Sequence, residues 1–148
     1  MTYRGLVFNN TITIGGDFMY LVESRNSKAV HDFDGRLRVD HFNEGPTYIV
    51  KLDKRTGKKV WEKEFKFPYS QIMFLSFTKG TLLVTGSFNV KANVHYRIYA
   101  FDGEKGKLNW EKEYKGGDTG GSHGEQWQHP VIIGNRIFLY PYIFDLKT

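Results

Sequence analysis

The amino-acid sequence predicts an all-β protein built from repeated units of four antiparallel strands. Three observations lead to this prediction. Leu52–Phe65, LDKRTGKKVWEKEF, recurs 49 residues later as Phe101–Tyr114, FDGEKGKLNWEKEY. Short runs of alternating apolar and polar residues are separated by Gly, Asn and Asp, as in strands joined by hairpin turns. The 16 glycines, 12 Phe and 9 Tyr among the 148 residues favour many turns around an aromatic core.

Each complete repeat is expected to contain two hairpins. The second hairpin of each repeat turns at Gly57 or Gly106, where the glycine supplies the positive φ that such a turn requires. An earlier hairpin precedes it, within Asn10–Glu23 in the first repeat and Met73–Gly86 in the second. Four antiparallel strands in about 49 residues form the blade of a β-propeller.

A third unit begins near His129 and reaches the sequence FDLKT, in which Asp145 aligns with Asp53. We therefore expect residues 1–148 to form one partial β-propeller with an incomplete ring. The expected blades cover about residues 10–66, 69–115 and 127–148, and the third lacks its outer strand. Two interpretations follow: the chain is part of a longer propeller, or it is a homo-oligomer, most simply a dimer with six blades. In the second, Thr2–Phe8 is apolar enough to supply the missing strand.

The run from an aspartate through Thr-Gly-Lys to a tryptophan resembles the repeat of the PQQ-like (quinoprotein-type) β-propellers. Lys51–Trp61, KLDKRTGKKVW, is a close match, and Ala100–Trp110, AFDGEKGKLNW, has lysine in place of the threonine. The resemblance implies that Trp61 and Trp110, beside the turns of Gly57 and Gly106, are largely buried and dock neighbouring blades. It also implies an extracytoplasmic location, periplasmic or secreted, although the N-terminal residues lack the layout of a signal peptide.

This resemblance implies two alternative functions. One is a non-catalytic binding or assembly scaffold that holds a protein or glycan, as in the family's outer-membrane assembly lipoprotein. The other is a fragment of a quinoprotein-like oxidoreductase acting on alcohols or sugars. Those dehydrogenases carry a vicinal cysteine pair over the quinone, whereas this chain has no cysteine. Their calcium ligands and catalytic aspartate match no motif here. We therefore assign no catalytic residue, disfavour PQQ and calcium as cofactors, and favour the scaffold.

Blade topology predicts which end of the sheets binds a ligand. The loops between second and third strands, and the crossovers between blades, share one face, and long loops on a rigid scaffold commonly bind ligands. Three long segments are expected there: Ser24–Gly45, Ser87–Val94 and Lys115–Pro130. The candidate ligand-binding residues are His123, Glu125, Gln126, Trp127, His129, Glu23, Arg25 and Asn26.

The role of the string HGEQWQH, His123–His129, stays open among structural hydrogen bonding, ligand contact and a metal site. In Ser24–Gly45 the acidic residues are spaced somewhat like calcium ligands, but the twelve-residue calcium-loop pattern is not met. We expect a solvated loop there. These acidic residues are Asp32, Asp34, Asp40 and Glu44.

Charge and hydropathy exclude two further classes of partner. The net charge is +5, but lysines alternate with glutamates in stretches such as WEKEFKF, as on solvated hairpins. Nucleic acid is therefore not expected as a partner. No run approaches the roughly 18 apolar residues of a membrane-spanning helix, so no span is expected.

Overall fold

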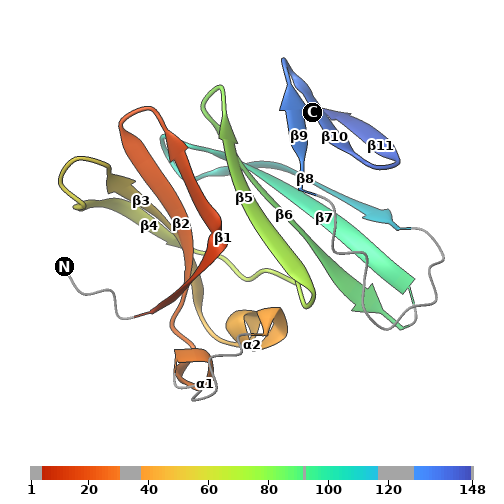
Figure 1. Cartoon of the computed structure of the whole chain (residues 1–148), viewed down its shortest axis with the longest axis horizontal. Helices are drawn as coiled ribbons and strands as arrows, with labels where there is room; N and C mark the ends of the chain where they lie inside the picture. Colours follow the sequence, from red (N-terminus) through yellow and green to blue (C-terminus); the bar gives the residue numbers. More distant parts are fainter. Residues whose placement is uncertain (1–4, 31–37, 92, 117–128, 148) are drawn as a thin grey trace.

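A computed structural model of the chain describes residues 5–30, 38–91, 93–116 and 129–147. These residues form three antiparallel sheets that follow one another along the chain, with two short helices at one end (Figure 1). The predicted all-β class and the antiparallel four-stranded sheets are confirmed. The three sheets do not close a ring. Helices α1 and α2 have four and six residues, far fewer than the roughly 20 that a bilayer span requires.

In each sheet the strands lie side by side in chain order, with four strands in the first and second sheets and three in the third. The first has the order β1 (Leu6–Gly15), β2 (Phe18–Ser24), β3 (Thr47–Asp53) and β4 (Lys59–Glu64). The second has β5 (Ile72–Thr78), β6 (Thr81–Val90), β7 (Asn93–Asp102) and β8 (Leu108–Lys115). The third has β9 (Val131–Ile133), β10 (Arg136–Leu139) and β11 (Tyr142–Asp145).

An aspartate at the end of the third strand builds the same kind of turn in each sheet. Asp53 Oδ1 accepts the backbone N–H of Thr56 at 2.7 Å, and Asp102 Oδ1 accepts that of Glu104 at 2.8 Å. In the third sheet Asp145 Oδ1 accepts the backbone N–H of Lys147 at 2.8 Å. These bonds explain why the aspartate recurs, because its side chain replaces a backbone acceptor in the turn. The glycines that follow, Gly57 and Gly106, have φ of 68° and 66°, the positive φ that the sequence predicts.

The first strand begins earlier than predicted. Leu6 and Val7 pair with Ser24 and Glu23 of β2, and a register shift separates them from the regular pairing that resumes at Ile12. The first sheet therefore starts at Leu6 rather than at residue 10. The idea that Thr2–Phe8 supplies the missing strand of the third sheet is wrong for Leu6–Phe8, because these residues complete β1. Residues 2–4 lie outside the described part of the chain.

Two segments predicted as irregular loops are more ordered than expected. Ser24–Gly45 contains α1 (Ser27–Val30) and α2 (Val39–Glu44), and the latter buries Phe42 against Phe8, with ring centroids 4.3 Å apart. The expectation of a solvated loop therefore fails at α2, because an apolar side chain ties it to the core. Asp32 and Asp34 lie outside the described residues. Ser87–Val94 is largely strand, because β6 runs to Val90 and β7 starts at Asn93.

Two apolar layers lie between the three sheets. The larger one fills the space between the first and second sheets and contains many aromatic side chains, among them Tyr20, Tyr69, Tyr99 and Phe101. The smaller one lies between the second and third sheets and is mainly aliphatic, with Leu83, Ile98, Ala100, Ile137, Leu139 and Leu146. Each sheet therefore packs through its faces.

Candidate functional site

The first and second sheets meet at the turn between β7 and β8. Trp61 of β4 donates its indole N–H to the Glu104 carbonyl at 2.8 Å, and Tyr20 of β2 donates its hydroxyl to the Gly103 carbonyl at 3.0 Å. The Lys51 ammonium of β3 lies 2.6 Å from the Glu104 carboxylate. The Lys51 side chain is entirely buried, whereas that of Glu104 is 77% exposed. Three neighbouring strands of the first sheet therefore bind one turn of the second.

Close aromatic packing surrounds this turn. The Tyr20 ring stacks on Phe77 of β5 with centroids 5.0 Å apart. A Cβ atom on Gly15 would lie only 2.2 Å from the Phe77 ring, so a larger residue there would force β1 and β5 apart. Gly106 combines its positive φ with a close approach, because a Cβ there would lie 3.1 Å from the Trp61 ring. Gly106 therefore serves both the turn and the contact between sheets, whereas a Cβ on Gly57 would meet no neighbouring atom and this glycine serves its turn alone.

The second and third sheets repeat only part of this arrangement. Trp110 of β8 donates its indole N–H to the Leu146 carbonyl at 3.1 Å. Leu83 and Ala100 occupy the positions that Tyr20 and Lys51 hold in the first sheet, so the two other polar contacts have no counterpart. Each indole thus reaches the next sheet, and Trp61 and Trp110 pack against the apolar layers between the sheets. Most of the surface of each residue is removed from solvent, as the sequence predicts.

Buried polar atoms also distinguish the two contacts. Within the described residues, four side-chain oxygens of the second sheet are buried and have no hydrogen-bond partner. They belong to Ser76, Thr85, Ser87 and Tyr114. Burial raises the pKa of the Tyr114 hydroxyl. A buried polar atom without a partner has a desolvation cost of about 1–3 kcal/mol. The contact between the second and third sheets is therefore less well satisfied than that between the first and second.

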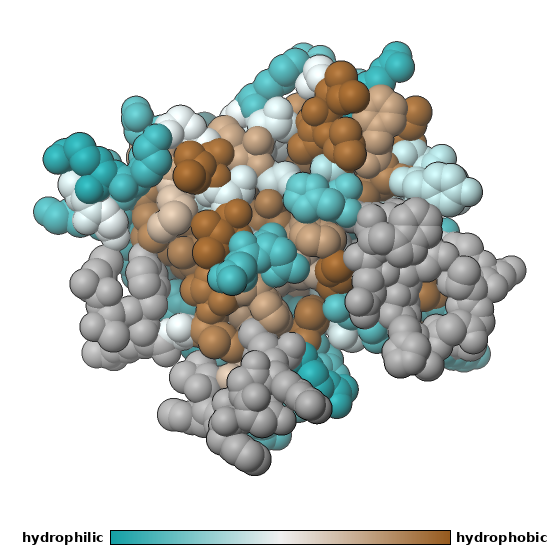
Figure 2. Space-filling model, viewed as in Figure 1, coloured by the Kyte–Doolittle hydropathy of each residue, from teal (hydrophilic) through white to brown (hydrophobic). Residues whose placement is uncertain are grey.

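The outer faces of the first and third sheets expose apolar side chains. On the third sheet Val131, Ile133 and Ile143 are 56%, 65% and 58% exposed. Figure 2 shows apolar side chains at the surface over this third sheet. On the first sheet Ile12 and Ile14 are 41% and 60% exposed. Such apolar faces on a regular sheet are typical of interaction surfaces.

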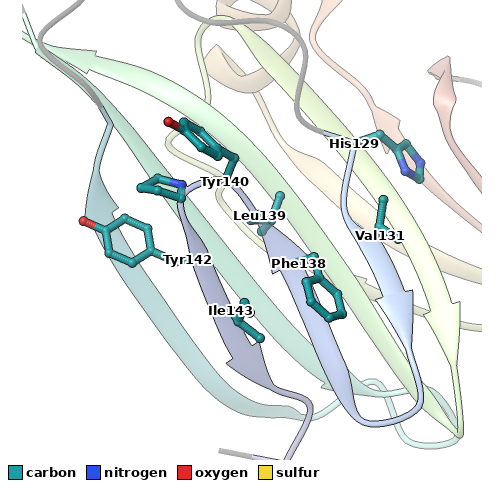
Figure 3. Close-up of a pocket in the computed structure, with 8 residues that line it drawn as sticks. His129, Val131, Phe138, Leu139, Tyr140, Tyr142 and Ile143 are labelled. Atoms are coloured by element: carbon teal, nitrogen blue, oxygen red, sulfur yellow. The ribbon is translucent and has the colours of Figure 1, made fainter.

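The outer face of the third sheet also carries a hollow of about 420 Å³. Its volume lies within the range of about 300–1,000 Å³ that is typical of ligand pockets. Figure 3 shows its walls rising from β9, β10 and the start of β11, with an imidazole at one end. The lining residues are His129, Val131, Phe138, Leu139, Tyr140, Pro141, Tyr142 and Ile143.

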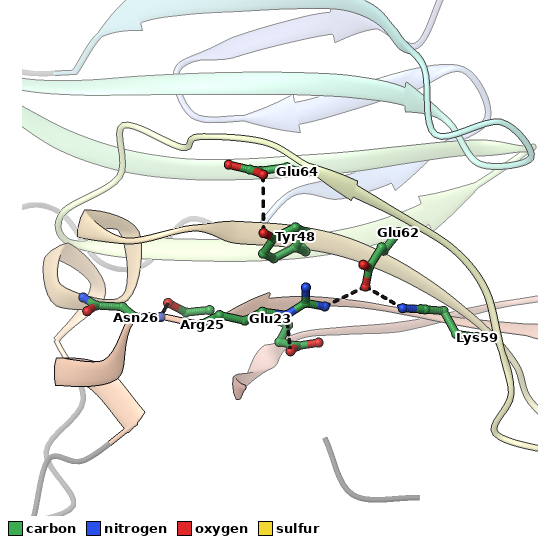
Figure 4. A network of polar contacts seen from close by, with 8 residues as sticks. Glu23, Arg25, Asn26, Tyr48, Lys59, Glu62 and Glu64 are labelled. Carbon is green, nitrogen blue, oxygen red and sulfur yellow. Dashed lines mark hydrogen bonds and ion pairs between the residues drawn. The ribbon is translucent and has the colours of Figure 1, made fainter. Parts of the chain in front are cut away.

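A polar network covers the end of the first sheet's outer face (Figure 4). The Arg25 guanidinium lies 2.6 Å from Glu62 and 2.9 Å from Glu23, and 3.9 Å from the centroid of the Tyr48 ring. Lys59 lies 2.8 Å from the same Glu62 carboxylate. Hydrogen bonds from Arg25 and Lys59 lower the pKa of the Glu62 carboxyl. The hydrogen bonds that Arg25 makes to Glu62 and Glu23 in turn raise the pKa of its guanidinium. Arg25 and Glu23 therefore form ion pairs within the first sheet.

Two more predicted ligand residues also have partners inside the chain. The Asn26 side chain donates to the His41 carbonyl at 2.6 Å and accepts the backbone N–H of Lys28 at 3.1 Å. The His129 ring packs edge-on against Phe74, with centroids 4.9 Å apart, and lines the hollow. The structure therefore does not bring His129 together with Glu23, Arg25 and Asn26 in one site.

The remaining predicted ligand residues, His123, Glu125, Gln126 and Trp127, lie outside the described residues. In the described part of the chain no three His, Asp or Glu side chains gather closely enough to hold a metal ion. Asp40, one of the acidic residues considered for calcium, pairs with Arg38.

Sequence reasoning missed the contribution of Lys51, Tyr20 and Glu104 to the contact between sheets. One signal was available, because Lys51 interrupts the apolar run Thr47–Leu52 at a position whose side chain faces the sheet interior. A lysine there requires a partner within reach. That partner lies 53 residues away, and the repeat does not indicate it, because the equivalent position is Ala100.

No protein-family model matches this chain, and no curated protein matches its sequence.

Proposed function

We propose that this chain is a non-catalytic assembly scaffold of the PQQ-like β-propeller type, whose outer sheet faces dock a second copy of the chain. The observation that supports this proposal is that the two exposed outer faces correspond to the two kinds of face that pack together inside the chain. Because the internal contacts join unlike faces, the outer faces pair in the same head-to-tail way.

The correspondence follows from strand register. Tyr20, Leu83 and Phe138 are each the third residue of the second strand in their sheet. The side chains of Tyr20 and Leu83 pack against the following sheet, so Phe138 lies on a face of that kind. This face of the third sheet is exposed at Val131 and Ile143.

The complementary face is found on the first sheet. Phe77 and Ile132 are each the residue before the last in the first strand of their sheet, and both pack against the preceding sheet. Ile14 holds this position in β1 and is 60% exposed. The outer face of the first sheet is therefore of the kind that packs against a preceding sheet.

Pairing these faces in both directions joins two chains through two equal contacts. A dimer formed in this way is a closed assembly with twofold symmetry, the commonest form among homo-oligomers. It arranges six sheets as the blades of one ring. The scaffold would act outside the cytoplasm, with protein partners held at the loop end, as in the assembly members of the family that the repeat resembles.

We propose that the scaffold works without a quinone or calcium cofactor. Arg25 and Glu23, two of the candidate ligand-binding residues, are paired with each other, which supports a structural role for both. We therefore expect that adding PQQ and calcium leaves the visible spectrum of the cofactor unchanged. A protein-dependent absorbance shift would favour the oxidoreductase alternative.

Light scattering at increasing protein concentration tests the assembly. The proposal predicts a mass that rises from 17.2 kDa toward twice this value in the micromolar range. Ile14→Glu places a charge on the outer face of the first sheet and is expected to hold the protein as a monomer. The control is Val90→Glu, because Val90 is 43% exposed at the tip of the β6–β7 hairpin, away from both faces. A mass that stays at that of one chain throughout would contradict the proposal.

A further inference from the structure

The hairpin turns of the three sheets join into one end of the molecule, opposite α1 and α2 (Figure 1). In each sheet a backbone hydrogen bond links the turn after the third strand to the turn between the first and second strands. These bonds run from Lys54 to Asp17 at 2.9 Å, from Gly103 to Gly80 at 2.8 Å, and from Leu146 to Asn135 at 2.7 Å. Between sheets, the Lys79 ammonium donates to the Asn135 side chain at 2.6 Å. We call this surface the turn end, and these bonds fix its turns relative to one another.

The turn end carries positive charges that the chain does not neutralise. Lys54 and Lys79 bind neutral oxygens, those of Gly16 and Asn135, so neither bond cancels the charge of the lysine. Six further basic side chains there are exposed and form no ion pair with another described residue. They are Arg55, Lys58, Lys105, Lys107, Arg136 and Lys147. Their charges therefore face the solvent.

The carboxylates of the turn end are mostly used inside the fold. Those of Asp53, Asp102 and Asp145 accept backbone N–H groups of their own turns, and that of Glu104 binds the buried Lys51. In the strands, by contrast, exposed lysines alternate with glutamates, as in the stretch WEKEFKF. Within the described chain, positive charge therefore gathers at the turn end rather than spreading evenly over the surface.

The arrangement of these charges suits a long anionic chain. They come from the turns of three successive sheets, and packed sheets lie roughly 10 Å apart, so the charges spread over the turn end instead of converging on one small anion.

The composition of the turns argues against two other polyanions. Their residues 16–17, 54–58, 79–80, 103–107, 134–135 and 146–147 include no aromatic side chain on which a nucleic-acid base could stack. None of these turns is a helix that could enter the major groove of a duplex. Leu146, the only large apolar residue among them, is buried, so no side chain of these turns is placed to enter a bilayer. A polyanion without bases or lipid chains is therefore the best match.

We propose that the turn end binds an acidic polysaccharide, a chain that carries carboxylate or sulfate groups along its length. Arg55 and Arg136 suit such groups, because a guanidinium donates two parallel hydrogen bonds to a planar oxyanion. The lysines between them supply point charges that follow the chain from sheet to sheet. This surface is separate from both outer sheet faces, so the proposal does not depend on self-association.

The test uses fluorescently labelled heparin, which is sulfated, and polygalacturonate, which carries carboxylates, with uncharged dextran as the control. Binding to the full chain is followed by anisotropy at several salt concentrations. We expect saturable binding of at least one acidic polysaccharide and none of dextran, with the logarithm of the binding constant falling linearly with the logarithm of the salt concentration. Absence of binding to both acidic polysaccharides would overturn the proposal.

Paired variants locate the site. Arg55→Gln with Lys58→Gln is expected to weaken polysaccharide binding about tenfold and to reduce the salt slope by about two. The matched control is Lys66→Gln with Lys112→Gln, which removes the same charge from exposed positions away from the turn end and is expected to change binding by less than about twofold. Equal weakening by the two pairs would overturn the proposal, because net charge alone would then explain binding.

Competition decides between the classes of polyanion. Mixed-sequence duplex DNA and vesicles of anionic lipid are added at the same concentration of charge as the labelled polysaccharide. We expect both to displace the polysaccharide less effectively than the same polysaccharide without its label. More effective displacement by DNA or by the vesicles would overturn the assignment of a polysaccharide partner.

Discussion

The contact between the first and second sheets and the contact between the second and third sheets come from one sequence repeat but differ in chemistry. Both have a tryptophan whose indole N–H binds a backbone carbonyl of the next sheet. Only the first adds Tyr20 and the buried Lys51, which bind the same turn. The second instead leaves polar oxygens, such as that of Tyr114, buried without partners among the described residues.

This difference shows which part of the contact the repeat conserves. The aspartate turn, the glycine and the tryptophan are common to both sheets, so they define how sheets stack. Tyr20 and Lys51, which bind the turn in the first contact, stand at positions that are Leu83 and Ala100 in the second. A contact with paired polar groups prefers one neighbour, because leaving them unpaired is costly. We infer that the first contact is specific for its partner and the second is more adaptable.

The largest expected effect comes from removing the shared tryptophans. Trp61→Ala is expected to lower the free energy of unfolding by about 3 kcal/mol, and Trp110→Ala by about 2 kcal/mol, because each leaves a cavity between sheets. The larger value belongs to Trp61, which lies in the more extensive aromatic layer. Urea melts of both variants measure the difference. A cost below about 1 kcal/mol for both would show that the tryptophans do not hold the sheets together.

The buried lysine provides the second comparison. Glu104→Gln leaves the Lys51 ammonium buried without its charged partner, and we expect a loss of about 2 kcal/mol, less than for a fully buried pair because Glu104 is exposed. Lys51→Met combined with Glu104→Gln is expected to recover part of this loss. As a control, Glu111→Gln on the exposed part of β8 should change stability by less than about 0.5 kcal/mol. If Glu104→Gln behaves like this control, the ion pair does not fix the contact.

Removing one tyrosine hydroxyl from each contact gives the closest comparison of the two contacts. Tyr20→Phe removes a hydroxyl that donates to the Gly103 carbonyl and is expected to cost about 1 kcal/mol. Tyr114→Phe removes a buried hydroxyl that has no partner among the described residues, so stability should stay the same or rise by about 0.5 kcal/mol. Chemical denaturation of both variants gives the two values. Equal losses would mean that the second contact is as well satisfied as the first.

The smallest expected effect concerns pH. Hydrogen bonds from Arg25 and Lys59 lower the pKa of Glu62 below its usual value. The stabilisation from Glu62 is therefore present above this usual pKa and is lost as the pH falls through the lower pKa of the folded state. Glu62→Gln should lower stability near neutral pH by less than about 1 kcal/mol and lose less on acidification than the unchanged protein. Urea melts of both proteins at acid and at neutral pH measure this. An equal loss of unfolding free energy on acidification in both proteins would contradict the prediction.

The sequence predicts the features that depend on local chemistry. The hairpins, the positive φ of Gly57 and Gly106 and the division into sheets all follow from alternation and turn residues. The helix α2 was not predicted, because it is short and is held by the distant contact between Phe42 and Phe8. The pairing of Leu6 and Val7 was also missed, because a register shift separates it from the regular part of β1.

The candidate site was predicted less well than the fold. Sequence reasoning placed the ligand site at the end of the sheets that carries the long segment Ser24–Gly45. In the structure Arg25 and Asn26 of this segment bind other residues of the chain. The exposed faces become visible only when strand register shows which side of each sheet Phe138 and Ile14 occupy. The partner of Lys51 also depends on how two sheets meet, and no local pattern contains this information.

The central claim, that the outer faces meet head to tail, can be tested by crosslinking, because the chain has no cysteine. Phe138 holds the position of Tyr20 and Ile14 holds that of Phe77, and Tyr20 stacks on Phe77 within the chain. Phe138→Cys and Ile14→Cys chains are therefore mixed and treated with a short bifunctional thiol reagent. The account predicts a covalent dimer that contains one chain of each variant, formed far more slowly when Val90→Cys replaces Phe138→Cys. Equal crosslinking of both mixtures, or none in either, would contradict the account.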